Sequence, residues 1–251
     1  MLATQLHDVL AGALVWFAIG LCGVLQPQNF WLVTRVLFPA GVIVGLALAA
    51  VALSAIFGAP SSLVLPLGLP DLPFHARLDA LSCFFLLLLG SVSAGVSAFA
   101  AGYFRRGEGT PPGLQCLYYH VFLGSMALVL VADDAYFFMV VWETMALSSF
   151  FLVTSDHGSA EIRRAGFLYL LIAHVGAIAI LLCFGALQGG TGDYTFETMR
   201  AVQPTPFWAT AAFLLALVGF GAKAGIVPLH VWLPEAHPAA PSPMSALMSA
   251  V

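Results

Sequence analysis

The chain has 251 residues, of which 61% are hydrophobic and only 8% are charged. Soluble domains are about 45–50% apolar, so a water-soluble globular fold is excluded. The formal net charge of −4 leaves no basic stripe of the kind that holds nucleic acid, which excludes nucleic-acid binding.

Seven apolar runs are each long enough to cross a bilayer, which takes about 20 residues. They lie near residues 8–25, 34–57, 79–103, 114–131, 135–154, 165–187 and 207–228. The runs are continuously apolar, whereas strands of a membrane barrel alternate over about ten residues. The sequence therefore predicts an all-α, polytopic transmembrane helix bundle.

The two ends of the chain carry different signals. The opening segment MLATQLHDVL lacks the Lys or Arg that begins a secretory signal, so we expect the first run to be retained as a span. The closing segment SPMSALMSAV starts a new apolar run and stops before it reaches the other side. It predicts an eighth span that is cut off.

The arginines predict an orientation, because cytoplasmic loops of membrane proteins carry an excess of Lys and Arg. The alternating path puts Arg77 and Arg200 on one side. It puts five arginines on the other, namely Arg35, Arg105, Arg106, Arg163 and Arg164. We therefore expect a multi-pass protein of the cell's inner (plasma) membrane with its N-terminus outside.

The seventh apolar run extends past Pro228 to His237, which is too long for one straight crossing. Gly219, Gly221, Gly225 and Pro228 lie where such a helix would break, and Pro228 cannot donate a hydrogen bond to the preceding turn. A break would leave a free carbonyl beside Lys223. Broken helices of this kind line ion sites in many transporters, although a simple packing kink is the alternative.

Three titratable side chains inside the predicted spans are candidates for proton transfer. Glu143 is near the middle of 135–154, Lys223 is the chain's only lysine, and His174 is near the middle of 165–187. Placing an acid or a lysine at the centre of a membrane helix costs roughly 2.5–3.5 kcal/mol, so such residues usually mark ion or proton pathways. The structural alternatives are a neutral Glu143, a static Glu143–Lys223 ion pair and a packing role for His174.

Other polar groups are assigned by position. His230 and His237 follow the predicted break and are candidates to continue a proton relay towards one surface. Asp79 and His120 are expected to be interfacial and solvated. Four cysteines lie singly in apolar runs and are expected to be core residues: Cys22, Cys83, Cys116 and Cys183. No phosphate-binding loop, nucleophile elbow or other enzyme motif is present.

Two segments, VVWETMALSSFFLV and GFGAKAGIVPLHVWLPEAHPAAPSPMSALMSAV, resemble the antiporter-like proton-translocating membrane subunits of respiratory complex I and Mrp antiporters. Together with RRAGFLYLLIAHVGAIAILL, they are most similar to the B component of hydrogenase-4 and its formate hydrogenlyase equivalent. The resemblance implies an inverted-repeat fold. Residues 1–104 would hold three N-terminal helices, and 105–251 would hold helices 4–8 of a first repeat that is incomplete at its C-terminus.

The resemblance also implies roles. Glu143 matches the family's fifth-helix glutamate and Lys223 its seventh-helix lysine, while His174, His230 and His237 match less diagnostic positions. It implies a subunit that moves protons, or sodium, and has no cofactor or redox chemistry of its own. Its partners would be other membrane subunits and a peripheral redox arm. The alternatives are a complex I or Mrp-type subunit, and a structural membrane anchor without transport.

Overall fold

The computed structural model describes residues 2–104 and 109–250, and within them seven helical segments are long and apolar enough to cross a membrane. The helices are α1 (Leu2–Leu25), α2 (Phe30–Leu32), a π-helical turn (Val33–Leu37), α3 (Phe38–Ala55), α4 (Ala80–Tyr103), α5 (Pro112–Val131), α6 (Ala135–Val153), α7 (Ala160–Leu187), α8 (Phe196–Ala201), α9 (Pro206–Ala224), a 3-10 turn (Leu229–Trp232), α10 (Leu233–Ala239) and α11 (Ser242–Ala250). The seven predicted spans are confirmed.

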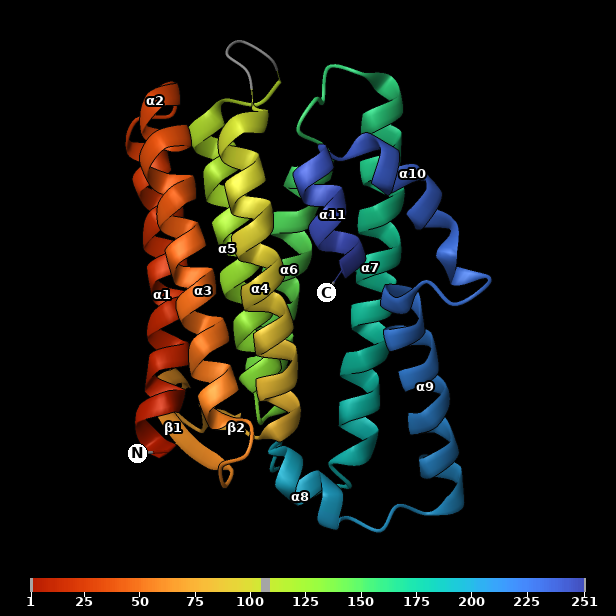
Figure 1. The fold of residues 1–251 in the computed structure, drawn as a ribbon. Helices are drawn as coiled ribbons and strands as arrows, with labels where there is room; N and C mark the ends of the chain where they lie inside the picture. Colours follow the sequence, from red (N-terminus) through yellow and green to blue (C-terminus); the bar gives the residue numbers. More distant parts are fainter. Residues whose placement is uncertain (1, 105–108, 251) are drawn as a thin grey trace.

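The long helices stand side by side as an upright bundle (Figure 1). α1 packs against α5 and α3, and α3 packs against α4. On the other side of the bundle α7 packs against α9, and α6 contacts both α5 and α7. α5 is the most buried of the seven spans, and its Tyr119 and Leu123 are fully buried. α6 therefore joins the N-terminal helices to the α7–α9 pair.

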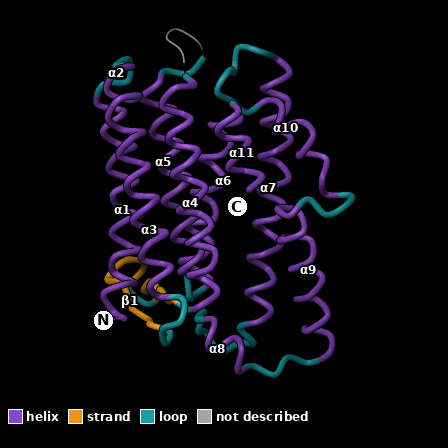
Figure 2. The backbone as a smooth tube through the Cα atoms, in the orientation of Figure 1, coloured by secondary structure: helices purple, strands orange, loops and turns teal. Residues whose placement is uncertain are grey.

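A β-hairpin interrupts the helical pattern, and the sequence did not predict it. β1 (Ser61–Leu69) pairs antiparallel with β2 (Leu72–Leu78), with an irregularity between Leu65 and Gly68. Figure 2 shows the hairpin at the same end of the bundle as the N-terminus. The fold is thus a helical membrane bundle with one small extramembrane hairpin.

The hairpin is tied to the start of α6. The backbone N–H of Asp133 donates to the His75 carbonyl at 2.8 Å. The Asp134 carboxylate accepts from the N–H groups of His75 and Phe137, each at 2.6 Å. Asp134 is therefore the N-cap of α6, and one side chain fixes both the hairpin and the helix that carries Glu143.

Arginines lie at both ends of the bundle, on different structural elements. The π-helical turn with Arg35 and the start of α7 with Arg163 lie at one end, and β2 with Arg77 and α8 with Arg200 lie at the other (Figure 1). This agrees with the predicted alternating path. Arg105 and Arg106 lie outside the described residues.

The predicted break in the seventh span is confirmed, and it falls at Gly225. This glycine has φ +72° and ends α9 in a left-handed conformation. Its N–H and that of Ile226 both point to the Gly221 carbonyl. The chain then turns through Pro228 into the short 3-10 turn and α10. Because the helix breaks here, the last turn of α9, which carries Lys223, lies between the two ends of the bundle.

Candidate functional site

Glu143 and His174 face each other between α6 and α7. The Glu143 Oε2 and His174 Nε2 atoms lie 3.6 Å apart, and their side chains are 33% and 46% exposed on the isolated chain. His174 Nδ1 lies 3.0 Å from the Leu170 carbonyl, an arrangement in which Nδ1 carries the proton and donates. In a neutral ring Nε2 is then an acceptor aimed at the carboxyl group. The two groups lie close enough to form an ion pair when the imidazole is protonated.

Lys223 lies in the last turn of α9, where the free carbonyls of a helix terminus favour a cation. Its Nζ atom is 5.9 Å from the ring centroid of Trp142 on α6 and 5.9 Å from that of Tyr169 on α7. Among the described residues no carboxylate oxygen lies within 4.0 Å of this nitrogen. The static Glu143–Lys223 ion pair, one of the expected alternatives, is not what this structure contains.

The two downstream histidines lie on either side of Trp232. His230 is in the 3-10 turn, and its Nδ1 is buried without a hydrogen-bond partner among the described residues. His237 on α10 stacks on Trp232, with ring centroids 6.4 Å apart, and its Nδ1 is 2.9 Å from Ser245 Oγ on α11. The structure thus places both residues beyond the break, and neither contacts Glu143 directly.

The aromatic residues of this region were not predicted as part of the site. The Trp232 indole N–H donates to the Ala222 carbonyl at 2.8 Å, so a carbonyl beside Lys223 is satisfied by a side chain. Tyr169 packs edge-on against Trp232 at 5.2 Å, and its hydroxyl is hydrogen-bonded to Ser149 of α6. One signal was present in the sequence, because Trp142 immediately precedes Glu143.

His120 corrects a prediction. It was expected to be solvated near the membrane surface, but it is fully buried in α5. Its Nδ1 is 2.9 Å from the Cys116 carbonyl, and its Nε2 has no hydrogen-bond partner among the described residues. The cysteine prediction holds for Cys83, Cys116 and Cys183, which are buried. It is wrong for Cys22, which lies on the outer surface of α1.

The extramembrane loop between α5 and α6 is charged. Burial raises the pKa of Asp133 above its ordinary value, and Arg77 and Arg200 partly offset this effect. The Arg200 guanidinium lies 3.5 Å from Asp133. Across the neighbouring loop, hydrogen bonds from the Thr198 hydroxyl and the Thr195 backbone N–H lower the pKa of Asp193. These contacts join α8 to the start of α6.

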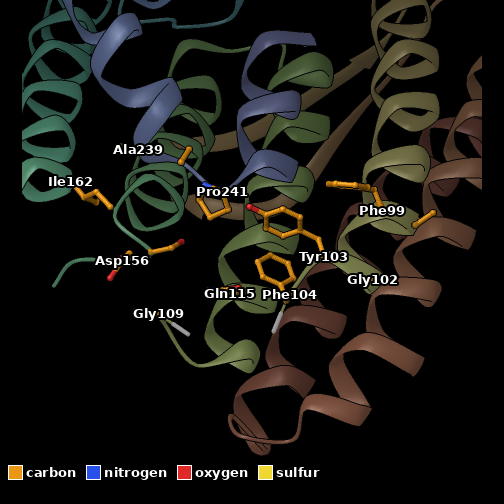
Figure 3. A pocket seen from close by; sticks show the side chains of 13 residues that line it. Phe99, Gly102, Tyr103, Phe104, Gly109, Gln115, Asp156, Ile162, Ala239 and Pro241 are labelled. Carbon is orange, nitrogen blue, oxygen red and sulfur yellow. The ribbon is translucent and has the colours of Figure 1, made fainter. Parts of the chain in front are cut away.

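The largest cavity that we describe lies at the opposite end from the hairpin and has a volume of about 940 Å³. In Figure 3 the rings of Tyr103 and Phe104 border it on one side, and Asp156 and Ile162 on the other. None of the predicted site residues lines it. In the described parts of the chain no three His, Cys, Asp or Glu residues are grouped so that they could hold a metal ion.

Comparison with known proteins agrees with this architecture. Residues 132–251, which include Glu143, His174 and Lys223, match the transmembrane family described as NADH:quinone oxidoreductase/Mrp antiporter. The matched segment is a little under half of the chain. The chain is thus similar to the membrane subunits of that family over the segment that contains the intramembrane charges.

Two individual proteins are similar to this chain over most of its length. Hydrogenase-4 component B of Escherichia coli (strain K12) is 43% identical over 175 residues, which are 70% of this chain and 26% of that protein. Formate hydrogenlyase subunit 3 of the same strain is 28% identical over 180 residues, 71% of this chain and 28% of that protein. The chain therefore spans about a quarter of the length of these relatives.

The fold is shared with solved membrane complexes. A chain of the Mrp complex from Dietzia sp. DQ12-45-1b superimposes with a TM-score of 0.77 at 20% sequence identity, over 97% of this chain and 45% of that one. At this identity the likeness concerns the fold alone. The chain is a multi-pass membrane protein with the antiporter-like helix arrangement.

Proposed function

We propose that this chain belongs to a membrane subunit that translocates protons, driven by redox chemistry in a partner, within a complex of the group 4 hydrogenase or formate hydrogenlyase type. The observation that carries the proposal is the contact between Glu143 and His174, 3.6 Å apart near the middle of two membrane-length helices. An imidazole can both accept and donate a proton, so a carboxyl group beside it provides two consecutive positions for a proton.

The surroundings of the pair support a relay. Lys223 lies at the break of α9. Among the described residues no carboxylate is paired with it, so no salt bridge fixes its ammonium in place. Beyond the break, His230 and the hydrogen-bonded pair of His237 and Ser245 continue the set of titratable groups. We propose Glu143, His174 and Lys223 as the central proton-carrying groups, with the two later histidines towards one surface.

The choice of complex rests on the relatives. The 43% identity to hydrogenase-4 component B and the similarity to formate hydrogenlyase subunit 3 favour a complex of the hydrogenase or formate hydrogenlyase type. A complex I or Mrp-type subunit with the same mechanism is the competing assignment. Purification of the native complex decides between them, because a nickel-containing subunit supports the first and an NADH-oxidising subunit the second.

The division of the chain and its orientation are also proposals. Residues 105–251 would form the first repeat of the inverted-repeat fold, after the three helices of 1–104. The end of the bundle with Arg35 and Arg163 would face the cytoplasm and the N-terminus the outside of the inner membrane. A cysteine introduced in α8 would then react with an impermeant maleimide added to intact cells.

The function is tested in the full-length subunit within its native complex, in sealed inverted vesicles. Glu143→Gln is expected to abolish dye-reported proton uptake while assembly and electron transfer are retained. Glu161→Gln, an exposed acid in the first turn of α7, is the matched control and should pump normally. If joint replacement of Glu143 and Lys223 by leucine leaves proton uptake unchanged, the proposal is wrong and the residues serve only a structural anchor.

A further inference from the structure

The ammonium of Lys223 is faced by two aromatic rings. Its Nζ atom is 5.9 Å from the centroid of Trp142 and 5.9 Å from that of Tyr169, inside the distance of about 6 Å at which a ring face attracts a cation. The rings come from different helices, α6 and α7, and Lys223 comes from a third, α9. The three long helices of this half of the bundle thus converge on one charge.

Both rings are held in place by their own neighbours. Trp142 stacks on Phe138 at 5.2 Å and meets Phe220 of α9 edge-on at 6.0 Å. Tyr169 is 2% exposed, its hydroxyl bonds to Ser149, and its ring packs against that of Trp232. The rings are therefore preorganised, and ordering them costs little when the ammonium enters.

A cation away from water needs compensation, and in the described residues no carboxylate supplies it to Lys223 within 4.0 Å. The negative faces of aromatic rings supply it without adding a titratable group. On α6 the ring of Trp142 faces Lys223, while the next residue, Glu143, contacts His174 of α7.

We propose that Trp142 and Tyr169 form a cation–π cage that keeps Lys223 charged while Glu143 is engaged with His174. The two rings are positioning residues, and the proposal rests on the proton-translocating function above. In the cage Lys223 carries its proton although no carboxylate of the described residues is paired with it.

The cage is tested with fluorinated tryptophans at position 142 of the full-length subunit in its native complex. Successive fluorines weaken the negative face of the indole ring while barely changing its shape. We expect proton uptake to fall stepwise along the series, roughly three- to tenfold in all. Trp142→Phe should fall between the first and last members.

The matched control is the same series at Trp208, an exposed tryptophan at the start of α9, which should leave uptake unchanged. A flat response at Trp142 would overturn the cage even where Lys223→Met abolishes pumping, and the proposed function would then stand alone. If Lys223→Met itself pumps normally, the proposed function and the cage fail together. The fluorinated series decides the matter even where Trp142→Leu does not assemble.

Discussion

The close crossing of α7 and α9 depends on a pair of glycines, and this gives a sharp prediction. A Cβ atom added at Gly219 would lie 2.5 Å from Ile180 Cγ1 and 2.8 Å from the Gly176 carbonyl oxygen. Ordinary contacts of a Cβ begin at 3.4 Å, so the shortfalls are about 0.9 and 0.6 Å. Gly219→Ala therefore forces the two helices apart, as expected where small residues let membrane helices approach.

The magnitude follows from two opposed effects. Overpacking of a close contact costs roughly 1–3 kcal/mol, and the clash at Gly219 involves backbone, which yields least. Ala gains about 1 kcal/mol over Gly in helix propensity. We expect a net loss of up to about 2 kcal/mol. Proton uptake should also fall, because Lys223 is about one turn further along α9 and would move away from Tyr169.

The assay is the thermal unfolding midpoint of the detergent-solubilised complex, measured alongside proton uptake in vesicles. Gly185→Ala is the control on α7, since a Cβ there meets nothing within 4 Å and only the gain in helix propensity remains. It should be neutral or slightly stabilising. If Gly219→Ala behaves like Gly185→Ala in both measurements, close packing at Gly219 is not what holds the two helices together.

The remaining predictions concern the break and the charged end. Trp232→Phe removes the indole donor to the Ala222 carbonyl, which should lower stability by about 1–3 kcal/mol in thermal unfolding; no change would mean that the bond does not hold the break. Thr198→Val removes the hydroxyl that bonds to Asp193 at 2.6 Å. Because that bond lowers the pKa of Asp193, its contribution is present above the ordinary carboxyl range, about pH 4, and is lost as the pH falls through the lowered pKa. Acid-induced proteolysis of 188–205 should therefore begin at higher pH in Thr198→Val, and equal onset would contradict this.

The spans were predictable because membrane crossing imposes a length and an apolar composition that the sequence displays directly. The break was predictable because Gly225 and Pro228 interrupt an overlong run. The hairpin of β1 and β2 was not, because it is held by distant partners: the Asp133 N–H bonds to the His75 carbonyl, and Asp134 caps α6 across the same contact. The sequence of the hairpin alone does not indicate this contact with the start of α6.

The sequence indicates candidate residues for the site, but it does not indicate which of them lie together. Glu143, His174 and Lys223 stand out as titratable groups in apolar runs, but which of them meet depends on how α6, α7 and α9 are rotated. In the structure Glu143 faces His174, and Lys223 faces the rings of Trp142 and Tyr169. Burial of His120 was missed for a related reason, because the position of α5 among its neighbours, not its sequence, removes that residue from the surface.

The proposed function requires that the intramembrane charges carry protons. The sharpest test is the number of protons moved per electron transferred, measured in sealed vesicles with the full-length Lys223→Met subunit in its native complex. We expect electron transfer to continue while this ratio falls to zero. A ratio equal to that of the unaltered complex would show that Lys223 carries no protons and that the proposed function is wrong.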